Sequence, residues 1–362
     1  MIAVDQETVH ELIRAARDNV SRNAFDYLIG GSECETTLAR NRAGYDRLAL
    51  IHRVLRNVEK IDLTSTFLGH KLRIPVMLAP LGALQALHPD GALAQVQGAE
   101  RFGTISYLSA MTKPVLEEIA AATKGPKIYQ LNVRGDADWV DGQVKRVIDH
   151  GYVGFCIMVD MAMFGRRERD ILKRYRAPVP PPIGPQSMMY AAAVDWDDIA
   201  RIRDRFAIPL IVKGIATAED AAQAASLGVD VVHISNHGGR QLDHGRGTID
   251  VLPEVVAAVA GKSRVVVDGG IARGTDVLKA LCLGADAVCI GRLYAYGLAA
   301  GGADGVVKVL EILETEMRIA MAQLRCTSIA ELAPEFVRVG APNSRPHVFS
   351  QFPHLKLDLG SY

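Results

Sequence analysis

Short apolar runs alternate with amphipathic stretches along most of the chain. From residue 74 on, each apolar run has the length of a strand, ends in a polar residue or glycine, and precedes a helical pattern. We predict strands at residues 75–79, 105–108, 127–131, 155–159, 209–212, 230–234, 264–267 and 287–290. Eight such βαβ units close into a (β/α)8 barrel. A doubly wound open sheet is the alternative, but six strands and a glycine-rich loop after the first would favour it, and the sequence has neither.

The pattern before residue 74 is helical. One apolar helix face has i, i+3, i+4, i+7 spacing, and it consists of Val9, Leu12, Ile13 and Ala16. We expect Asp5 to cap this helix and a second helix to span residues 22–28, ending at the glycine pair 30–31. The prediction is a single domain over residues 1–362, with N-terminal helices at 1–73 and the barrel at 74–325.

The connection after the fourth predicted strand is unusually long. It runs from Asp160 to a helix that we expect to begin near Asp195, and it holds a basic cluster at 166–176 and a proline-rich run at 177–185. The prolines exclude a long helix there. Long barrel loops commonly act as lids, so we predict a lid loop at 161–194, with a passive surface insertion as the alternative. Further along, residues 217–220 have the pattern of a capping box.

Composition narrows the class of protein. Apolar residues make up 49% and charged residues 23%, as in ordinary globular proteins, and 41 acidic residues balance 41 basic ones. This balance argues against a nucleic-acid partner. Five cysteines show no metal-binding spacing, so we expect reduced core cysteines, no metal and a cytoplasmic location. The N-terminus does not look like a signal peptide, and no apolar stretch has the length of a membrane span.

Chemically capable residues gather where the predicted strands end, which is where a barrel carries its active site. The most informative stretch is SNHGGRQLD at 235–243, which places the base His237 three residues from the cation Arg240. Such a pair suits a substrate with an anionic handle next to a removable proton. Asp160 ends another strand and is expected to orient the imidazole; a purely structural histidine is the alternative. A metal pair of His233 and His237 is not expected, because the segment is not a helix.

Three other strand ends suggest anion binding. Residues 268–275 and 290–292 are glycine-rich, so their backbone amides and the following helix starts suit a phosphate, with plain turns as the alternative. Lys213 ends an apolar run, where a lysine is costly unless it meets an anion. It is predicted to stabilise developing negative charge or form a Schiff base, with a structural salt bridge as the alternative.

At this point the chain resembles the FMN-dependent α-hydroxy acid oxidases and dehydrogenases, which include glycolate oxidase, lactate oxidase and mandelate dehydrogenase. The resemblance covers residues 25–329. It rests on SNHGGRQLD and on further motifs in the family's order, including Phe25-Asp26-Tyr27, Leu78-Ala79-Pro80, Tyr129-Gln130-Leu131, Gly165-Arg166-Arg167-Glu168, Val212-Lys213-Gly214, Asp268-Gly269-Gly270 and Gly291-Arg292.

The resemblance implies an FMN cofactor and a role for each matching residue. His237 would be the active-site base with Asp160 as its partner, and Lys213 would stabilise the reduced flavin. The substrate would contact Tyr27, Arg167, Arg240, Asn132 and Met111. The cofactor would contact Pro80, Leu81, Gly82, Ser109, Gln130, Met158, Lys213, Ser235, Asp268, Gly269, Gly270, Arg273, Gly291 and Arg292.

Several positions depart from the family. Met111 stands where glycolate oxidase has tryptophan, and Asn132 stands where a tyrosine usually touches the substrate. Ala272 replaces the first arginine of the usual phosphate loop, and we expect Arg273 to compensate. Gly82 matches mandelate dehydrogenase rather than several oxidases, which hints at a slow reaction with oxygen.

The resemblance therefore implies oxidation of an (S)-2-hydroxy acid, which we expect to be bulky or aromatic, to the 2-oxo acid. Two alternatives stay open: FMN-dependent oxidation of a related substrate other than a hydroxy acid in biosynthesis, and a flavin-binding barrel without turnover. The family also implies a homo-oligomer, a tetramer or an octamer.

Overall fold

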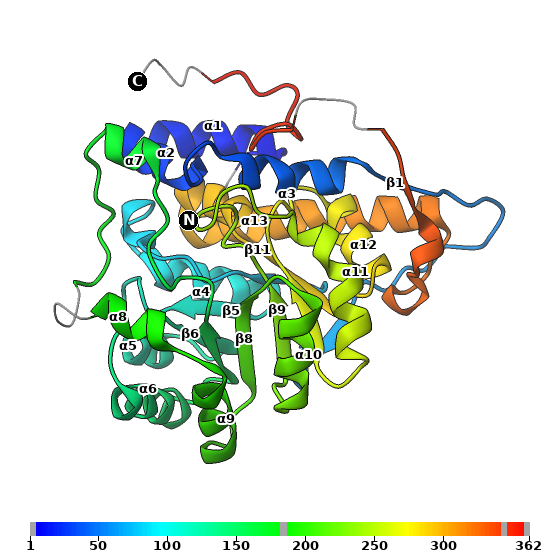
Figure 1. The fold of residues 1–362 in the computed structure, drawn as a ribbon. Helices are drawn as coiled ribbons and strands as arrows, with labels where there is room; N and C mark the ends of the chain where they lie inside the picture. Colours follow the sequence, from blue (N-terminus) through cyan, green and yellow to red (C-terminus); the bar gives the residue numbers. More distant parts are fainter. Residues whose placement is uncertain (1–4, 182–186, 342–345, 358–362) are drawn as a thin grey trace.

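A closed barrel of parallel strands forms the centre of the molecule (Figure 1). The computed structural model describes residues 5–181, 187–341 and 346–357. Strand order follows chain order around the barrel, and the last strand pairs with the first. The strands are β4 (Val76–Leu78), β5 (Ser106–Ser109), β6 (Lys127–Leu131), β7 (Gly154–Met158), β8 (Leu210–Ile215), β9 (Val231–Ile234), β10 (Arg264–Val267) and β11 (Ala287–Ile290). The predicted (β/α)8 barrel is confirmed, and the open sheet is excluded.

Helices surround the barrel, as Figure 1 shows. They are η1 (Leu84–Ala86), α4 (Gly91–Phe102), α5 (Leu116–Ala122), α6 (Ala137–Asp149), α9 (Trp196–Arg205), α10 (Ala218–Ser226), α11 (Thr248–Val259), α12 (Gly274–Cys282) and α13 (Arg292–Leu324). α13 contains a kink at Gly301 and Gly302. The predicted cap of α9 at Asp195 is confirmed as a capping box. Thr217 caps α10, but the Asp220 carboxylate accepts from the Thr217 hydroxyl and not from its backbone N–H, so the predicted capping box is incomplete.

The N-terminal segment differs from prediction in its cap and in one helix. α1 (Val9–Asn19) buries the predicted apolar face, but Thr8 caps it in a box with Glu11, so the prediction of Asp5 was wrong. α2 (Arg22–Ile29) ends at Gly30 as expected. α3 (Thr36–Asp46) was not predicted, because its buried face includes the polar residues Asn41 and Arg42 instead of an apolar stripe.

The barrel interior is a packed core and not a channel. Buried side chains from the strands fill it, and the hairpin of β2 (Ser65–Phe67) and β3 (His70–Leu72) adds Phe67 and Leu72 to this cluster. β1 (Leu48–Leu50) pairs with β12 (Val337–Val339), which follows the short turns η2 (Ile329–Glu331) and η3 (Pro334–Phe336). This packing leaves the C-terminal strand ends as the place for a site.

The long connection after β7 contains two short helices, α7 (Glu168–Leu172) and α8 (Ser187–Ala193). No long helix forms in its described part, as the prolines predict; residues 182–186 of the proline-rich run lie outside that part. Lys173 pairs with Asp26 of α2, and Arg169 Nε lies 2.6 Å from Glu35 Oε1. These ion pairs join the connection to the N-terminal segment above the barrel.

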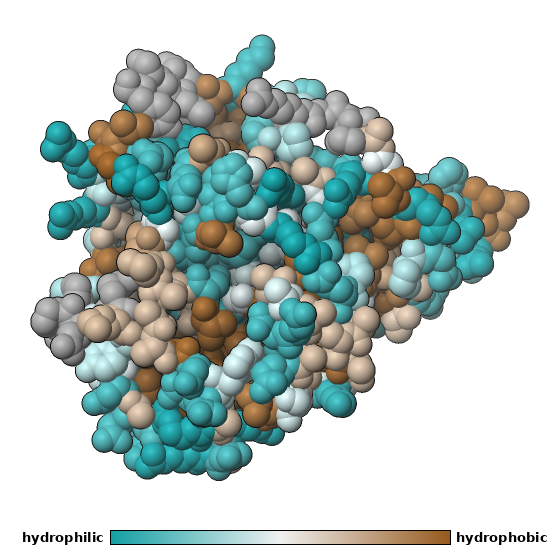
Figure 2. Space-filling view, in the orientation of Figure 1, coloured by the Kyte–Doolittle hydropathy of each residue, from teal (hydrophilic) through white to brown (hydrophobic). Residues whose placement is uncertain are grey.

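The face shown in Figure 2 is mostly hydrophilic, with hydrophobic residues gathered at the projecting right-hand end. The loop after β1 lies at that end in Figure 1, and its Val54 and Leu55 are exposed. None of the described helices combines the length and the apolar character needed to cross a membrane. All five cysteines are free thiols, and Cys34 alone among them is exposed.

Candidate active site

The SNHGGRQLD stretch forms a tight loop after β9 that only glycine-rich sequence permits. His237, Gly238 and Gly239 have φ values of 58°, 64° and 77°, which lie in the left-handed region. A Cβ on Gly239 would lie 2.6 Å from the backbone nitrogen of Leu38, and one on Gly238 would lie 2.8 Å from Nη1 of Arg292. The two glycines therefore let the loop fit against α3 and α13 while His237 faces the barrel mouth.

His237 and Asp160 form the predicted pair. Nδ1 of His237 lies 3.3 Å from Oδ1 of Asp160, and a quarter of the histidine side chain is exposed. Burial lowers the pKa of His237 below that of a free histidine, although Asp160 opposes this shift. Burial alone would raise the pKa of Asp160, but the charges of His237 and Lys213 outweigh it and lower that pKa. At neutral pH the pair is thus a neutral imidazole held by a carboxylate.

Two guanidinium groups meet at the ring of Tyr27. Arg240 Nη1 donates to the carbonyls of Tyr27 (2.7 Å) and Gly30 (2.8 Å), and its guanidinium lies 4.6 Å from the Tyr27 ring centroid. The Arg167 guanidinium lies 5.8 Å from the same centroid. Arg167 is only 6% exposed, and its Nε has no hydrogen-bond partner among the described residues. Burial, and secondly Arg240, lower the pKa of Arg167 to about 9, so it is still protonated at neutral pH. A buried, protonated Arg167 guanidinium with an unpaired N–H group favours binding of an anion.

Lys213 lies in a buried polar cluster below His237. Its Nζ donates to Ser235 Oγ at 2.8 Å and lies 3.4 Å from Asp268 Oδ2. Burial lowers the pKa of Lys213, but Asp268 and Asp160 outweigh it and raise that pKa. His233, which was considered from the sequence only as a metal ligand and rejected in that role, lies 3.2 Å from Asp268, and burial lowers its pKa. Lys213 therefore forms a buried salt bridge with Asp268, which was the structural alternative, and it also lines the cavity beside His237.

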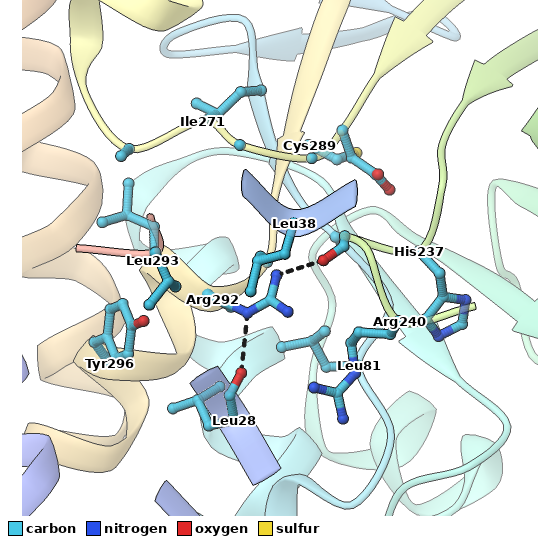
Figure 3. A pocket seen from close by; sticks show the side chains of 18 of the residues that line it. Leu28, Leu38, Leu81, His237, Arg240, Ile271, Cys289, Arg292, Leu293 and Tyr296 are labelled. Atoms are coloured by element: carbon cyan, nitrogen blue, oxygen red, sulfur yellow. Dashed lines mark hydrogen bonds between the residues drawn. The ribbon is translucent and has the colours of Figure 1, made fainter. Parts of the chain in front are cut away.

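One cavity runs from Lys213 and His237 along the barrel mouth to the start of α13 (Figure 3). Most of the predicted cofactor residues line it, namely Pro80, Leu81, Gly82, Lys213, Asp268, Gly269, Gly270, Gly291 and Arg292. Tyr27, Arg167 and Arg240 line it as well. The Ser235 side chain lies in the polar cluster with Lys213.

Arg292 supports binding of a phosphate at the far end of this cavity. It donates to three backbone carbonyls, those of Leu28 (3.0 Å), Gly238 (2.9 Å) and Gly30 (2.7 Å); the bonds to Leu28 and Gly238 are drawn in Figure 3. Carbonyl contacts leave its full charge in place. Burial, and secondly Arg240, lower the pKa of Arg292 to about 10. Because α13 begins at Arg292, its positive helix end adds to the same field. These features fit the phosphate of FMN.

Arg273 is placed differently from its predicted role. Its Nη1 donates to Glu316 Oε1 at 2.7 Å and its Nη2 to the carbonyl of Gln351 at 3.0 Å. It does not belong to the described lining of the cavity, whereas Ala272 does. The carboxylate of Asp276 accepts the backbone N–H groups of both Ala272 and Arg273 and so caps this end of α12. The compensation that we expected from Arg273 therefore has no direct contact to support it.

A second cavity of about 1050 Å³ adjoins the first on the side of the long connection. The predicted residues Met111, Asn132, Ser109, Gln130 and Met158 line it, together with His237 and Arg167. Asn132 is buried; its Oδ1 accepts a hydrogen bond from Gln130 Nε2 at 2.8 Å. This bond fixes the orientation of the Asn132 amide. His237 lines both cavities.

Sequence reasoning did not assign a role to Asp243, the last residue of SNHGGRQLD. Its carboxylate accepts the backbone N–H groups of Cys34 (3.0 Å), Thr36 (3.3 Å) and Thr37 (2.7 Å). It thus fixes the start of α3 against the loop that carries His237. Cys34, Asp243 and His244 are grouped closely enough for a metal ion, but these amide bonds already engage both oxygens of Asp243.

A barrel mouth that brings a histidine–carboxylate pair and two arginines to one cavity is typical of an enzyme. Comparison with known proteins specifies the kind. The family model for FMN-dependent dehydrogenase matches residues 16–339. The chain belongs to this family and is therefore an FMN-dependent enzyme.

Relatives and solved structures agree with this assignment. The chain is 37% identical to L-lactate oxidase from Nostoc sp. over 91% of this chain and 97% of that protein. It is 38% identical to a peroxisomal (S)-2-hydroxyacid oxidase from Arabidopsis thaliana, over 94% and 98% respectively. Mandelate oxidase superimposes with a TM-score of 0.87 at 35% identity, covering 93% of this chain and 99% of the other. A soluble mutant of (S)-mandelate dehydrogenase from Pseudomonas putida gives 0.86 at 31%, covering 92% and 100%.

Proposed function

We propose that this enzyme oxidises an (S)-2-hydroxy acid to the corresponding 2-oxo acid, with His237 as the base. The observation that carries the proposal is the meeting of the His237–Asp160 pair with the guanidiniums of Arg167 and Arg240 in one cavity beside Lys213. The names of the relatives, which include an L-lactate oxidase and an (S)-2-hydroxyacid oxidase, support the same substrate class.

The two arginines supply binding and orientation. A carboxylate placed between Arg167 and Arg240 would receive charge-assisted hydrogen bonds worth about 1.5–3 kcal/mol each. Tyr27 lies against both guanidiniums and limits where that carboxylate can sit. Fixing the carboxylate brings the neighbouring carbon and its hydroxyl group to His237 in one orientation.

His237 takes up a proton through Nε2. Nδ1 faces Asp160, so Nδ1–H donates to the carboxylate and Nε2 keeps its lone pair. Asp160 then stabilises the imidazolium that forms. The hydroxy acid gives up two protons and two electrons: His237 takes one proton, and FMN, when bound, supplies the acceptor for the two electrons and the other proton. Lys213, in the same cavity, stabilises negative charge that develops there.

The second cavity favours a bulky or aromatic substrate side chain. Its volume of about 1050 Å³ includes space for the flavin, because the predicted cofactor residues Ser109, Gln130 and Met158 line it too. On the substrate side, Met111 offers flexible apolar contact, and the fixed amide of Asn132 offers a hydrogen bond. Its described lining also contains five arginines and one carboxylate, Asp170, which suits an anionic substrate.

The test is anaerobic reduction of the bound flavin. Purified holoenzyme is mixed with 2-hydroxy acids that bear small, aliphatic and aromatic side chains, and bleaching of the flavin absorbance is recorded. Bleaching by at least one (S)-acid, and loss of several orders of magnitude in its rate in His237→Ala, is the expected result. If no hydroxy acid reduces the flavin, the proposal fails. Admitting air to the reduced enzyme then distinguishes an oxidase from a dehydrogenase.

The homotetramer or octamer stays a prediction from the family resemblance, and the cytoplasmic location stays a prediction from the cysteine content. Size-exclusion chromatography with light scattering tests the first, and fractionation of the source cells tests the second.

A further inference from the structure

The C-terminal segment, residues 346–357, returns to the barrel mouth at the end of the cavity where Arg292 lies. Val348 and Phe352 of this segment line the cavity next to Ile271 and Ala272. Phe352 is only 3% exposed, so its ring is part of the folded interior and not a loose end. Chain from the far end of the sequence therefore forms one wall of the cofactor cavity.

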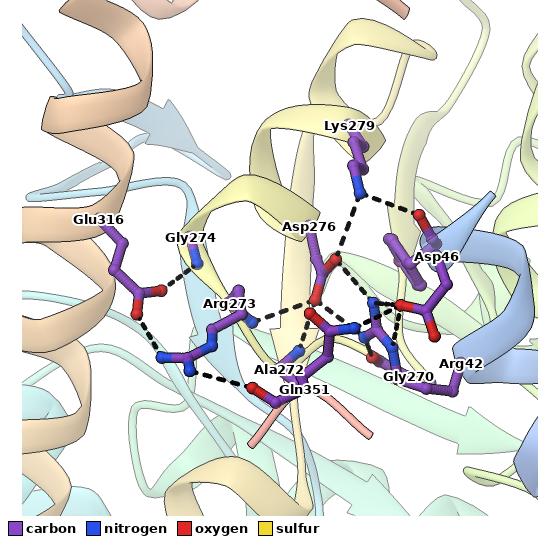
Figure 4. A network of polar contacts seen from close by, with 12 residues as sticks. Arg42, Asp46, Gly270, Ala272, Arg273, Gly274, Asp276, Lys279, Glu316 and Gln351 are labelled. Carbon is purple, nitrogen blue, oxygen red and sulfur yellow. Dashed lines mark hydrogen bonds and ion pairs between the residues drawn. The ribbon is translucent and has the colours of Figure 1, made fainter. Parts of the chain in front are cut away.

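Polar contacts hold this segment to the glycine-rich loop at residues 268–275 (Figure 4). Arg273 Nη2 donates to the carbonyl of Gln351 at 3.0 Å, and the Arg273 guanidinium lies 5.0 Å from the ring centroid of Phe352. The Gln351 side chain donates to Asp46 Oδ1 at 2.5 Å. The same Asp46 oxygen lies 2.9 Å from Arg42, so the segment is tied to α3 as well as to the loop.

Aromatic contacts dock the segment on both sides of these bonds. The ring of Phe349 stacks on Phe25 with a centroid distance of 6.4 Å and lies 6.2 Å from the ring of Tyr296. Phe352 makes an edge contact with His10 at 5.5 Å. Tyr296 also lines the cavity. The segment therefore both contributes lining residues and packs against another lining residue.

We propose that residues 346–357 close the phosphate end of the FMN site and slow the release of FMN, and that Arg273 serves the cofactor by anchoring this segment. Ala272 contributes no cation to the phosphate, and Arg42, which also lines the cavity, is paired with Asp46 and Asp276. Arg292 therefore carries the charge that is directly available at this cavity end. Excluding water and salt from one ion pair strengthens it, because the local dielectric falls and screening is reduced. A wall containing Val348 and Phe352 provides such exclusion.

The experiment measures FMN release from the holoenzyme by the recovery of free flavin fluorescence after dilution, at low and high ionic strength. The test variants are Phe352→Ala and a chain lacking residues 341–362. The control is Phe336→Ala, which removes an equally buried ring away from the cavity. We expect release to be at least about tenfold faster in both test variants, with a stronger salt dependence, and unchanged in the control. Release at the wild-type rate in Phe352→Ala would overturn the proposal, even if the shortened chain fails to fold.

A double-mutant cycle tests the part played by Arg273. Arg273→Gln should speed FMN release in the full-length chain but add nothing in the chain lacking residues 341–362, since its anchored partner is then gone. An equal fold-change in both backgrounds would show that Arg273 acts on the phosphate directly and would refute the anchoring role. If the shortened chain does not fold, Phe352→Ala serves as the second background; Arg273→Gln should then have a smaller effect than in the wild-type background, because the ring that its guanidinium faces is gone. These readouts use no substrate, so they are independent of the proposed hydroxy acid oxidation.

Discussion

Replacing Asp160 with asparagine isolates the electrostatic part of the proposed base. The shape of the side chain is kept, but the charge facing His237 at 3.3 Å is lost. At an effective dielectric constant of about 20, that charge stabilises an imidazolium by at most about 5 kcal/mol. A charge-assisted hydrogen bond is worth about 1.5–3 kcal/mol net, which sets the lower bound. The rate of flavin reduction should therefore fall between about 10-fold and about 5000-fold in Asp160→Asn.

The assay is stopped-flow bleaching of the flavin at saturating hydroxy acid, repeated across pH. Only neutral His237 accepts a proton, so the rate should fall as pH drops through the pKa of His237. Asp160 raises that pKa against the effect of burial, and removing it should move the midpoint to lower pH. The flavin spectrum, which should not change, serves as the control. A reduction rate within about threefold of wild type, with an unmoved midpoint, would refute the assigned role.

Three further substitutions test other parts of the structure. Arg167→Met should raise KM for the hydroxy acid by about 10- to 150-fold while FMN content stays constant, and an unchanged KM would contradict the carboxylate site. Gly239→Ala should lower the free energy of unfolding by about 2 kcal/mol or more, since φ is 77° and the new Cβ would meet Leu38; urea titration measures this. Lys213→Met should cost about 3–5 kcal/mol because it leaves Asp268 buried without its cation, and an unshifted urea midpoint would argue against that.

The barrel was predictable because its strands are buried and short. Each strand appears in the sequence as an apolar run bounded by polar residues or glycine. Because strands and helices alternate along the chain, few sheet topologies are possible. The site followed from the same fact, since strand ends converge in a barrel whatever the details. His237, Asp160 and Lys213 lie in three different strand-end positions and still meet.

Elements stabilised by polar or distant contacts were not predictable. α3 buries Asn41 and Arg42, so no apolar periodicity marks it. The C-terminal segment has no local pattern that shows where it docks, because its partners lie at residues 10, 25, 46 and 273. The direction of the Arg273 side chain depends on Glu316 and Gln351, far away in sequence, and so the loop motif alone could not show which groups it contacts.

Charge pairing separates the arginines of the mouth into two groups. Arg42 is held by Asp46 and Asp276, and its raised pKa reflects carboxylates that outweigh the effect of burial; its charge is already neutralised by the fold. Arg167 is buried and Arg292 is partly buried, but the bonds described for Arg292 go to carbonyls, and desolvation lowers the pKa of both. Keeping an uncompensated cation buried costs stability. Binding of an anion would recover this stability cost. The unpaired charges therefore support the two proposed anion positions in the cavity, a phosphate at Arg292 and a substrate carboxylate at Arg167.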